Sequence, residues 1–337
     1  MKYFLLLVII ITGLNSKAQK NDFLVTKISL PPQISYFDNQ FSGLYIHEEK
    51  LFFMSESRLQ DKVEAKLYSI ETADLDRKMQ DTSYILPFKK IPIIDLDVLV
   101  KKMDALGDEY EGLEAIIIKG NNVYLSVETT TESNNCYLLK GILNDTAVLL
   151  NDNDIILQPK PITPVGTHVY NAGFEALALS KNLLFSFYEF NYFPKVNSVN
   201  MIQLKNFNNT SLTNFNIEKL PFRITDITST GKNKFTAINY FYKGSGKDEV
   251  YRLPLNETEN NALIKDSSNY HSYCRLVKIK YKNDSFTWQP LWDFPKEYMS
   301  YNWEGIAAYK NGYFIVNDKY TNAKPYSSVL LYLSATK

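Results

Sequence analysis

Three pairs of acidic residues share one spacing along the chain, and each pair is centred on an asparagine. They are Glu114 and Glu128 about Asn121, Glu175 and Glu189 about Asn182, and Glu304 and Asp318 about Asn311. Carboxylates bind hard cations such as Ca²⁺ and move protons in hydrolysis. The repeated spacing predicts that these acids act as one group if the fold gathers the pairs in one place.

Two weaker copies extend the pattern. Ser42 and Glu56 are equally distant from Glu49, and Asp226 and Tyr240 are equally distant from Asn233. The acids of all five copies are Glu56, Glu114, Glu128, Glu175, Glu189, Asp226, Glu304 and Asp318. Like charges brought this close together favour either protonation or a bound cation.

Each copy consists of an apolar run, a polar turn and a second apolar run, which is the pattern of a β-hairpin. Asparagine suits the left-handed backbone of tight turns, and Tyr, Phe, Ile, Val and Leu suit strands. Residues equally distant from a hairpin turn face each other. We therefore expect each acidic pair to lie at the open end of its hairpin, away from the turn.

Further apolar runs follow the hairpins and complete four-stranded units. These runs are Ala65–Ile70, Cys136–Gly141, Val196–Leu204, Cys274–Tyr281 and Ser327–Leu333. The repeat predicts an all-β, single-domain β-propeller of five or six blades over residues 19–337. The stretch Phe23–Leu30 is expected to close the ring, Asn256–Asn269 to form an exposed insertion, and Ile93–Met103 to be either a strand or a short helix.

If the hairpins are the inner strands of successive blades, their open ends surround one mouth of the central channel. Oxygen ligands from separate loops suit Ca²⁺ better than Mg²⁺, which demands tight octahedral geometry. The alternative is structural, because acids near strand ends also accept hydrogen bonds from backbone N–H groups. His168 lies shortly before Glu175 and is a candidate general base, with an exposed loop histidine as the alternative.

The first residues read as an export signal. A basic Lys2 precedes the apolar run Phe4–Ile11, and Ser16-Lys17-Ala18 provides small residues for cleavage. We expect residues 1–18 to be a signal peptide and the protein to be exported, to a periplasm or outside the cell. Cys136 and Cys274 either pair in that oxidising environment or are small buried side chains.

Composition excludes several classes of function. Lys plus Arg and Asp plus Glu both number 37, so a nucleic-acid partner held by phosphate neutralisation is not expected. No later apolar stretch is long enough to span a membrane. The chain also lacks Cys-x-x-Cys and His-Glu-x-x-His patterns, which argues against zinc sites of the usual kinds.

The order of motifs resembles the bacterial phytase-like family, described as having esterase-like phytase activity. The matching elements are Ser42-Gly43-Leu44, Glu111-Gly112-Leu113, Asn171-Ala-Gly-Phe-Glu-Ala-Leu-Ala178, Asn302-Trp-Glu-Gly-Ile-Ala307 and Asn317-Asp318. The resemblance covers roughly Gln40 to Leu333 and implies a propeller hydrolase. It favours Glu111 as the acid of its second element, whereas the internal repeat favours Glu114. Where the family has Leu-Glu-Arg, this chain has Ile238-Asn239-Tyr240, and a basic residue expected near His168 is missing.

Two hypotheses follow. The first is an exported, Ca²⁺-dependent hydrolase of phosphate or carboxylic esters, with Glu175, Glu304 and His168 as candidate catalytic residues. Its candidate metal ligands are Glu111, Glu114, Glu175, Asp226, Glu304 and Asp318. The second is a non-catalytic propeller that binds an unknown ligand, with any metal in a structural role; the loss of the two basic positions favours it.

Overall fold

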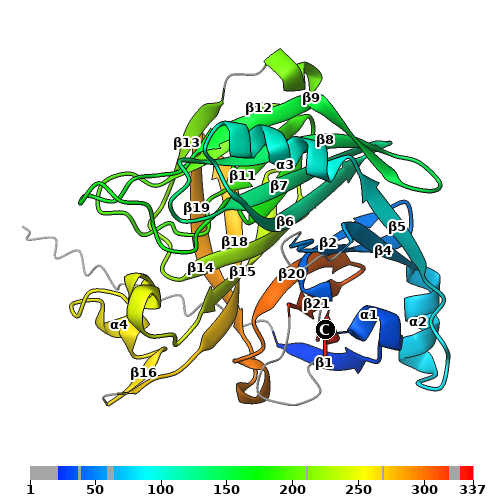
Figure 1. The fold of residues 1–337 in the computed structure, drawn as a ribbon. Helices are drawn as coiled ribbons and strands as arrows, with labels where there is room; N and C mark the ends of the chain where they lie inside the picture. The colour runs from blue at the N-terminus through cyan, green and yellow to red at the C-terminus, as the bar shows by residue number, and fades with distance from the viewer. Residues whose placement is uncertain are drawn as a thin grey trace, which may run out of the picture.

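The computed structural model describes residues 22–36, 39–58, 64–209, 212–267, 269–318 and 327–336. The predicted signal peptide lies outside these residues. The described chain is dominated by β-strands, as predicted (Figure 1). In this part of the chain no helix is both long enough and apolar enough to cross a bilayer.

The long strands form five successive antiparallel units of four. The first unit contains β2 (Phe41–His47), β3 (Lys50–Ser55), β4 (Lys66–Glu71) and β5 (Lys89–Ile94), and the second contains β6 (Tyr110–Lys119), β7 (Asn122–Thr129), β8 (Asn135–Leu143) and β9 (Val148–Pro159). The third unit contains β10 (Ala176–Ser180), β11 (Leu183–Phe187), β12 (Ser198–Gln203) and β13 (Thr213–Ile217), and the fourth contains β14 (Arg223–Gly231), β15 (Lys234–Phe241), β18 (Tyr273–Lys282) and β19 (Ser285–Asp293). The fifth unit contains β20 (Trp303–Tyr309), β21 (Gly312–Asn317), β22 (Leu330–Ala335) and β1 (Phe23–Ile28). Short parallel pairings of β5 with β9 and of β13 with β19 join neighbouring units at their outer edges.

The first strands of the five units stand side by side in a ring. β2 lies between β6 and β20, β14 lies between β10 and β20, and β6 contacts β10. The N-terminal strand β1 pairs along its length with β22, as predicted, so the first and last segments of the fold share a sheet (Figure 1). Sheets arranged around a common axis in this way form a β-propeller.

Apolar side chains fill the spaces between neighbouring units. One cluster joins the first and second units through residues such as Met54 and Ile116, and another joins the fourth and fifth through Leu276 and Ile315. Similar clusters occupy the other three junctions. Each sheet therefore covers the face of the next one, and this packing positions the strand ends near the axis.

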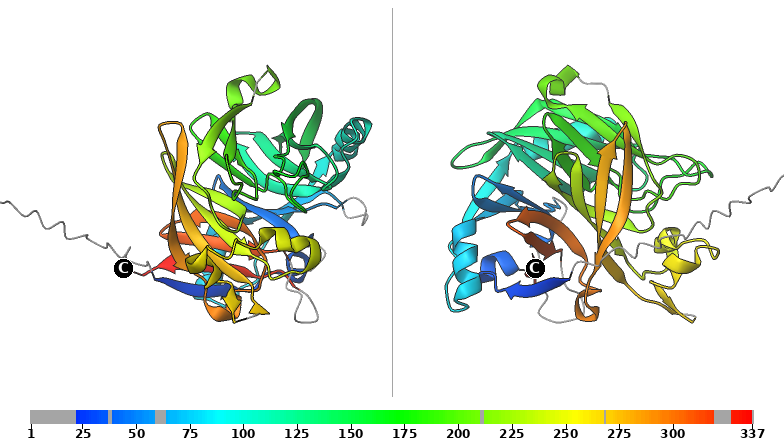
Figure 2. Two further views of the ribbon diagram at one scale, coloured as in Figure 1. Left: turned by 90° about the vertical axis from the view of Figure 1, so that its left-hand side faces the viewer. Right: turned by 180° about the vertical axis from the view of Figure 1, so that it is seen from behind.

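The remaining elements lie in the segments that connect the strands of the ring. They are α1 (Pro32–Ser35), α2 (Thr72–Gln80), α3 (Leu96–Ala105), α4 (Thr258–Asn261), the short strands β16 (Lys265–Asp266) and β17 (Asn269–Tyr270), and three 3₁₀ turns at Leu204–Asn209, Gly246–Tyr251 and Lys296–Tyr298. The segment left open as strand or helix contains both, since β5 ends at Ile94 and α3 starts at Leu96. The predicted insertion forms an arm around α4, β16 and β17, and Figures 1 and 2 place this arm and α2 on opposite sides of the molecule.

The turns differ in detail from the prediction. The hairpins close with two-residue turns, so the asparagine is the second turn residue rather than the centre. The left-handed conformation falls on the preceding residue in three of them, at Gly120, Lys181 and Lys310, and on the asparagine itself only at Asn233. Cys136 and Cys274 are both buried and unpaired.

Candidate functional site

A β-bulge interrupts the innermost strand of four units near the channel mouth. The bulged residues are Ser42, Glu114, Thr225 and Glu304. A bulge inserts an unpaired residue and turns its side chain in a new direction. In the third unit Glu175 takes the corresponding place directly before β10.

The end of the second strand in each unit supplies a second set of side chains. These are Glu56, Glu128, Glu189, Tyr240 and Asp318. Their backbone partners lie before the bulges: Glu56 N–H donates to Gln40 O at 2.7 Å, and Asp318 N–H donates to Asn302 O at 3.0 Å. The two sets together encircle the mouth of the channel.

The bulges change the predicted pairing. Glu128 lies opposite Gly112 rather than opposite Glu114, and Tyr240 lies opposite Arg223 rather than opposite Asp226. A count of residues outward from the turn does not include the extra residue that the bulge inserts, so it predicts the wrong partner beyond the bulge. Thr225, not Asp226, is therefore the counterpart of Glu114 and Glu304.

Six carboxylates line one cavity of about 150 Å³ at this mouth. They are Glu56, Glu114, Glu128, Glu175, Glu304 and Asp318. The side chains of Arg58 and Arg223 reach the same cavity. The structure thus brings together Glu114, Glu175, Glu304 and Asp318 from the predicted metal set, with Glu56 and Glu128 beside them.

Burial raises the free energy of the ionised form of these carboxyl groups. Glu114, Glu128 and Glu175 are each less than a tenth exposed. Loss of water is the largest cause that raises the pKa of each carboxyl, and the neighbouring carboxylates raise it further. The pKa of Glu304 is raised in the same way, by burial first and then by Asp318.

Arg223 provides the main compensating charge. Its Nη1 lies 2.9 Å from Oε1 of the fully buried Glu189. The Tyr251 hydroxyl donates to Glu189 Oε2 at 2.7 Å, and the Tyr251 ring packs against the guanidinium at 3.9 Å. Burial raises the pKa of Glu189, while Arg223 and Tyr251 favour its ionised form.

Glu175 and Glu189 also affect each other's ionisation. Burial first, and then the charge of Glu189, raise the pKa of Glu175. Arg223 and Tyr251 favour the ionised form of Glu189, so Glu175 is the member of the pair that binds a proton more readily.

Three predicted site residues lie outside the cavity lining. Glu111 is a second bulged residue of β6 and pairs with Arg58 at 3.3 Å. The ring nitrogens of His168 lie 3.1 Å from Pro161 O and 3.3 Å from Asn134 Oδ1. The cavity lining therefore contains Glu114 of the Glu111–Glu114 doublet, and His168 lies in a loop outside that lining.

Asp226, the third of these residues, ties neighbouring inner strands together. Its carboxylate accepts hydrogen bonds from Ile227 N–H at 2.8 Å and from Ile306 N–H at 2.7 Å. The backbone of Leu44 makes a further hydrogen bond to it. This geometry matches the structural alternative for this acid, which links β14 to β20 and β2.

Sequence reasoning missed Arg58, Arg223 and Tyr251. The repeat contained a signal for Arg223. It lies two residues before the bulge of the fourth unit, and Gln40 and Asn302 occupy the same position in the first and fifth units. Gln40, Arg223 and Asn302 all line the cavity. Tyr251 belongs to the segment between β15 and β18, which has no counterpart in the repeat, and no local pattern marks it.

The donor set fits a hard divalent cation by chemistry and by charge. Six carboxylates face two arginines, and Oε1 of the buried Glu128 has no hydrogen-bond partner. Such an atom is costly unless an ion or a proton satisfies it. As the side chains of the described residues stand, however, no three His, Cys, Asp or Glu residues are arranged to hold a metal, so binding would require rotamer changes among them.

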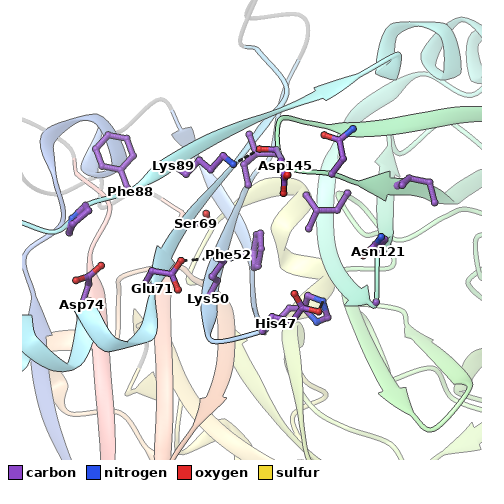
Figure 3. A pocket seen from close by; sticks show the side chains of 17 residues that line it. His47, Lys50, Phe52, Ser69, Glu71, Asp74, Phe88, Lys89, Asn121 and Asp145 are labelled. Carbon is purple, nitrogen blue, oxygen red and sulfur yellow. Dashed lines mark hydrogen bonds and ion pairs between the residues drawn. The ribbon is translucent and has the colours of Figure 1, made fainter.

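A larger groove of about 660 Å³ lies at the opposite, turn end of the first two units (Figure 3). Both of its lysines have partners: Lys50 pairs with Glu71 at 3.7 Å, and Lys89 donates to the carbonyl oxygen of Asp145. Figure 3 shows Phe52 and Phe88 among these residues. The smaller carboxylate cavity is the better candidate for chemistry because six carboxylates and two arginines of the described chain gather in it.

Comparison with known proteins assigns no family. No family model matches the sequence, and no curated protein matches it. Solved structures of similar shape include a Coprinopsis cinerea GH62 α-L-arabinofuranosidase catalytic domain (9% identity, TM-score 0.49, covering 93% of this chain and 97% of that one) and a phage phi92 endosialidase (9%, 0.47, 94% and 70%). A PQQ-bound aldose sugar dehydrogenase from Streptomyces coelicolor is also similar (10%, 0.41, 93% and 99%). We draw no activity from likenesses this distant.

Proposed function

We propose that the chain is an exported, single-domain, five-bladed propeller that hydrolyses a small-molecule ester at the carboxylate cavity with the help of a divalent cation, most suitably Ca²⁺. One observation carries the proposal: among the described residues, six carboxylates from four units converge on one cavity whose lining includes two arginines. A structural role alone does not account for so many buried acids, because each raises the free energy of the folded state unless its charge is compensated.

Glu114, Glu128 and Glu304 are the ligands that this proposal assigns to the cation. They come from the second and fifth units and face the same cavity. Glu128 Oε1, which has no hydrogen-bond partner, is free to coordinate. When bound, a Ca²⁺ ion supplies Lewis acidity toward an ester oxygen.

Two acids have the positions for proton transfer. Glu304 accepts a proton from the attacking water, and the water oxygen forms the new bond to the acyl or phosphoryl centre. The bond to the alcohol oxygen breaks, and the protonated Glu175 gives its proton to the departing alcohol oxygen. Arg223 pairs with Glu189 and favours its ionised form, and the charge of Glu189 in turn favours the protonated form of Glu175.

The second candidate is a non-catalytic binding propeller. It is favoured by the absence, among the described residues, of three side chains already arranged to hold a metal. It is also favoured by the position of His168 outside the cavity lining, which leaves the site without a histidine base. In this case the acids and arginines would recognise a ligand without transforming it.

Turnover separates the two candidates. The purified protein is assayed with p-nitrophenyl acetate, p-nitrophenyl phosphate and a lactone, with Ca²⁺ or with a chelator. The hydrolase proposal expects Ca²⁺-dependent release of product that Glu175→Gln reduces at least a hundredfold. A Ca²⁺-dependent rise in melting temperature without turnover of any ester supports the binding module instead.

A further inference from the structure

A second cavity of about 270 Å³ adjoins the carboxylate cavity. The two share Asn171, Arg223, Asn302 and Asp318 in their linings, so they lie next to each other. The volume lies just below the range of about 300–1,000 Å³ typical of drug-sized ligands. It therefore suits a single ring with its substituents.

The segment between β15 and β18 builds the outer wall of this second cavity. It contributes Tyr242 and Asp248 to the lining. Tyr251 anchors the segment, since its hydroxyl lies 2.7 Å from Glu189 Oε2 and 2.9 Å from the carbonyl oxygens of Tyr170 and Asn171. The same hydroxyl contacts Glu189, the acid that interacts with Glu175 of the carboxylate cavity. Tyr251 therefore fixes the position of the wall relative to the carboxylate cavity.

The lining combines aromatic rings with neutral polar groups. Tyr170 and Tyr242 offer ring surfaces, and Asn171, Ser300 and Asn302 offer amide and hydroxyl groups. Rings of this kind pack against the flat C–H face of another ring. Amides and hydroxyls both donate and accept hydrogen bonds, as vicinal hydroxyl groups require.

The charged residues of the lining are Arg223, Asp248 and Asp318, and the two acids disfavour an anionic ligand. Arg223 is already paired with Glu189 and lies 3.7 Å from Asp248, so it has little capacity left for an anion. Lys247 stands over the Tyr170 ring at 5.2 Å, where it opposes a ligand cation on that ring face. Neither a phosphate nor a quaternary ammonium group is therefore the best occupant.

We infer that this second cavity binds an uncharged sugar ring, and that the substrate is an ester of a sugar whose ester bond extends into the carboxylate cavity. The inference rests on the proposed hydrolase function for the ester bond, and on the second cavity alone for the sugar. The larger groove in Figure 3 is the natural comparison, because it also presents an exposed aromatic side chain, Phe88, on the opposite face of the ring.

The test is saturation-transfer NMR with the full protein and the methyl glycosides of glucose, galactose, mannose and xylose, with tetramethylammonium and inorganic phosphate as separate probes. We expect transfer to at least one glycoside. Tyr242→Ala should weaken that binding about tenfold, while the matched variant Phe88→Ala should leave it unchanged. Tyr242 is about half exposed, so its truncation should leave the fold intact, and the melting temperature of both variants checks this.

Three results would overturn the inference: no glycoside receives saturation, the binding survives Tyr242→Ala, or only tetramethylammonium or phosphate binds in a Tyr242-dependent way. A Ca²⁺-induced rise in melting temperature is measured on the same samples. If that rise is present and glycosides do not bind, the sugar inference fails while the cation proposal stands. If glycosides bind and the rise is absent, the sugar inference stands and the cation proposal fails.

Discussion

The side chain of Glu128 packs directly on the backbone of Gly173, in the neighbouring unit. A Cβ atom at position 173 would lie 3.0 Å from Glu128 Cγ and 3.3 Å from Glu128 Oε1. Glu56 has the same relationship to Gly112, where a Cβ would lie only 2.7 Å from Glu56 Cγ. The acid of one unit thus reaches the channel across a glycine of the next, which explains why Gly112 and Gly173 precede Glu114 and Glu175 by two residues.

Gly112→Ala should displace Glu56 and Glu114, since the new methyl group would also lie 2.9 Å from Glu114 Oε1. We expect a loss of about 1–3 kcal/mol in the free energy of unfolding, as in other overpacked interiors, together with weaker Ca²⁺ binding. Gly173→Ala, with its longer contacts, should have a smaller effect. Urea unfolding of both variants measures this order, and equal stability of all three proteins would contradict it.

The buried acids predict an unusual dependence of stability on pH. Burial and mutual repulsion raise the pKa values of Glu114, Glu128, Glu175 and Glu304 in the folded state. The folded protein therefore binds more protons than the unfolded chain, and stability falls as pH rises above about 4.3, the ordinary value for Glu. In chelator, the melting temperature should fall as pH rises from acidic toward neutral values. Ca²⁺ should flatten this fall, and a chelated protein that gains stability over the same range would argue against buried, repelling acids.

The pair of Arg223 and Glu189 should behave as a coupled unit. Arg223→Met leaves Glu189 buried without its cation and should cost about 3–5 kcal/mol. Adding Glu189→Gln should recover most of that loss, because the double variant buries no uncompensated charge at this point. A double-mutant cycle by urea unfolding gives the coupling energy, and strictly additive effects would show that the ion pair is not the link.

Asp226 should prove structural rather than metal-binding. Asp226→Asn replaces one acceptor oxygen with an amide, which cannot accept the N–H of Ile227 or Ile306. We expect a loss of about 1–3 kcal/mol in stability, with Ca²⁺ affinity within twofold of the unchanged protein. A loss of Ca²⁺ binding at full stability would return Asp226 to the ligand set.

Much of the architecture is readable from the sequence because the hairpins repeat. The alternation around Asn182 and Asn311, with an acid at each open end, was enough to predict inner strands whose ends meet at one mouth. The pairing of β1 with β22 also followed, because a ring needs its first strand to close it. In these places the sequence was sufficient to predict the strands and their pairing, since the spacing of the repeat fixes where each hairpin turns and where its ends lie.

The failures arise where geometry departs from the repeat. A bulge adds one residue without a distinctive composition, so Asp226 was predicted in the position that Thr225 takes. Tyr251 reaches Glu189 from an insertion, over a sequence distance that no periodic pattern encodes. The ambiguous segment near Ile94 holds a strand and a helix separated only by Asp95, whose left-handed φ of 69° marks the break.

The central claim is that the converging acids hold a divalent cation. Isothermal titration of the purified protein with CaCl₂ at neutral pH tests it most directly. We predict a saturable site that disappears in Glu128→Gln, while the same variant melts at a higher temperature than the unchanged protein in chelator, because one repelling charge is gone. No saturable binding, or binding that Glu128→Gln leaves intact, would contradict the claim.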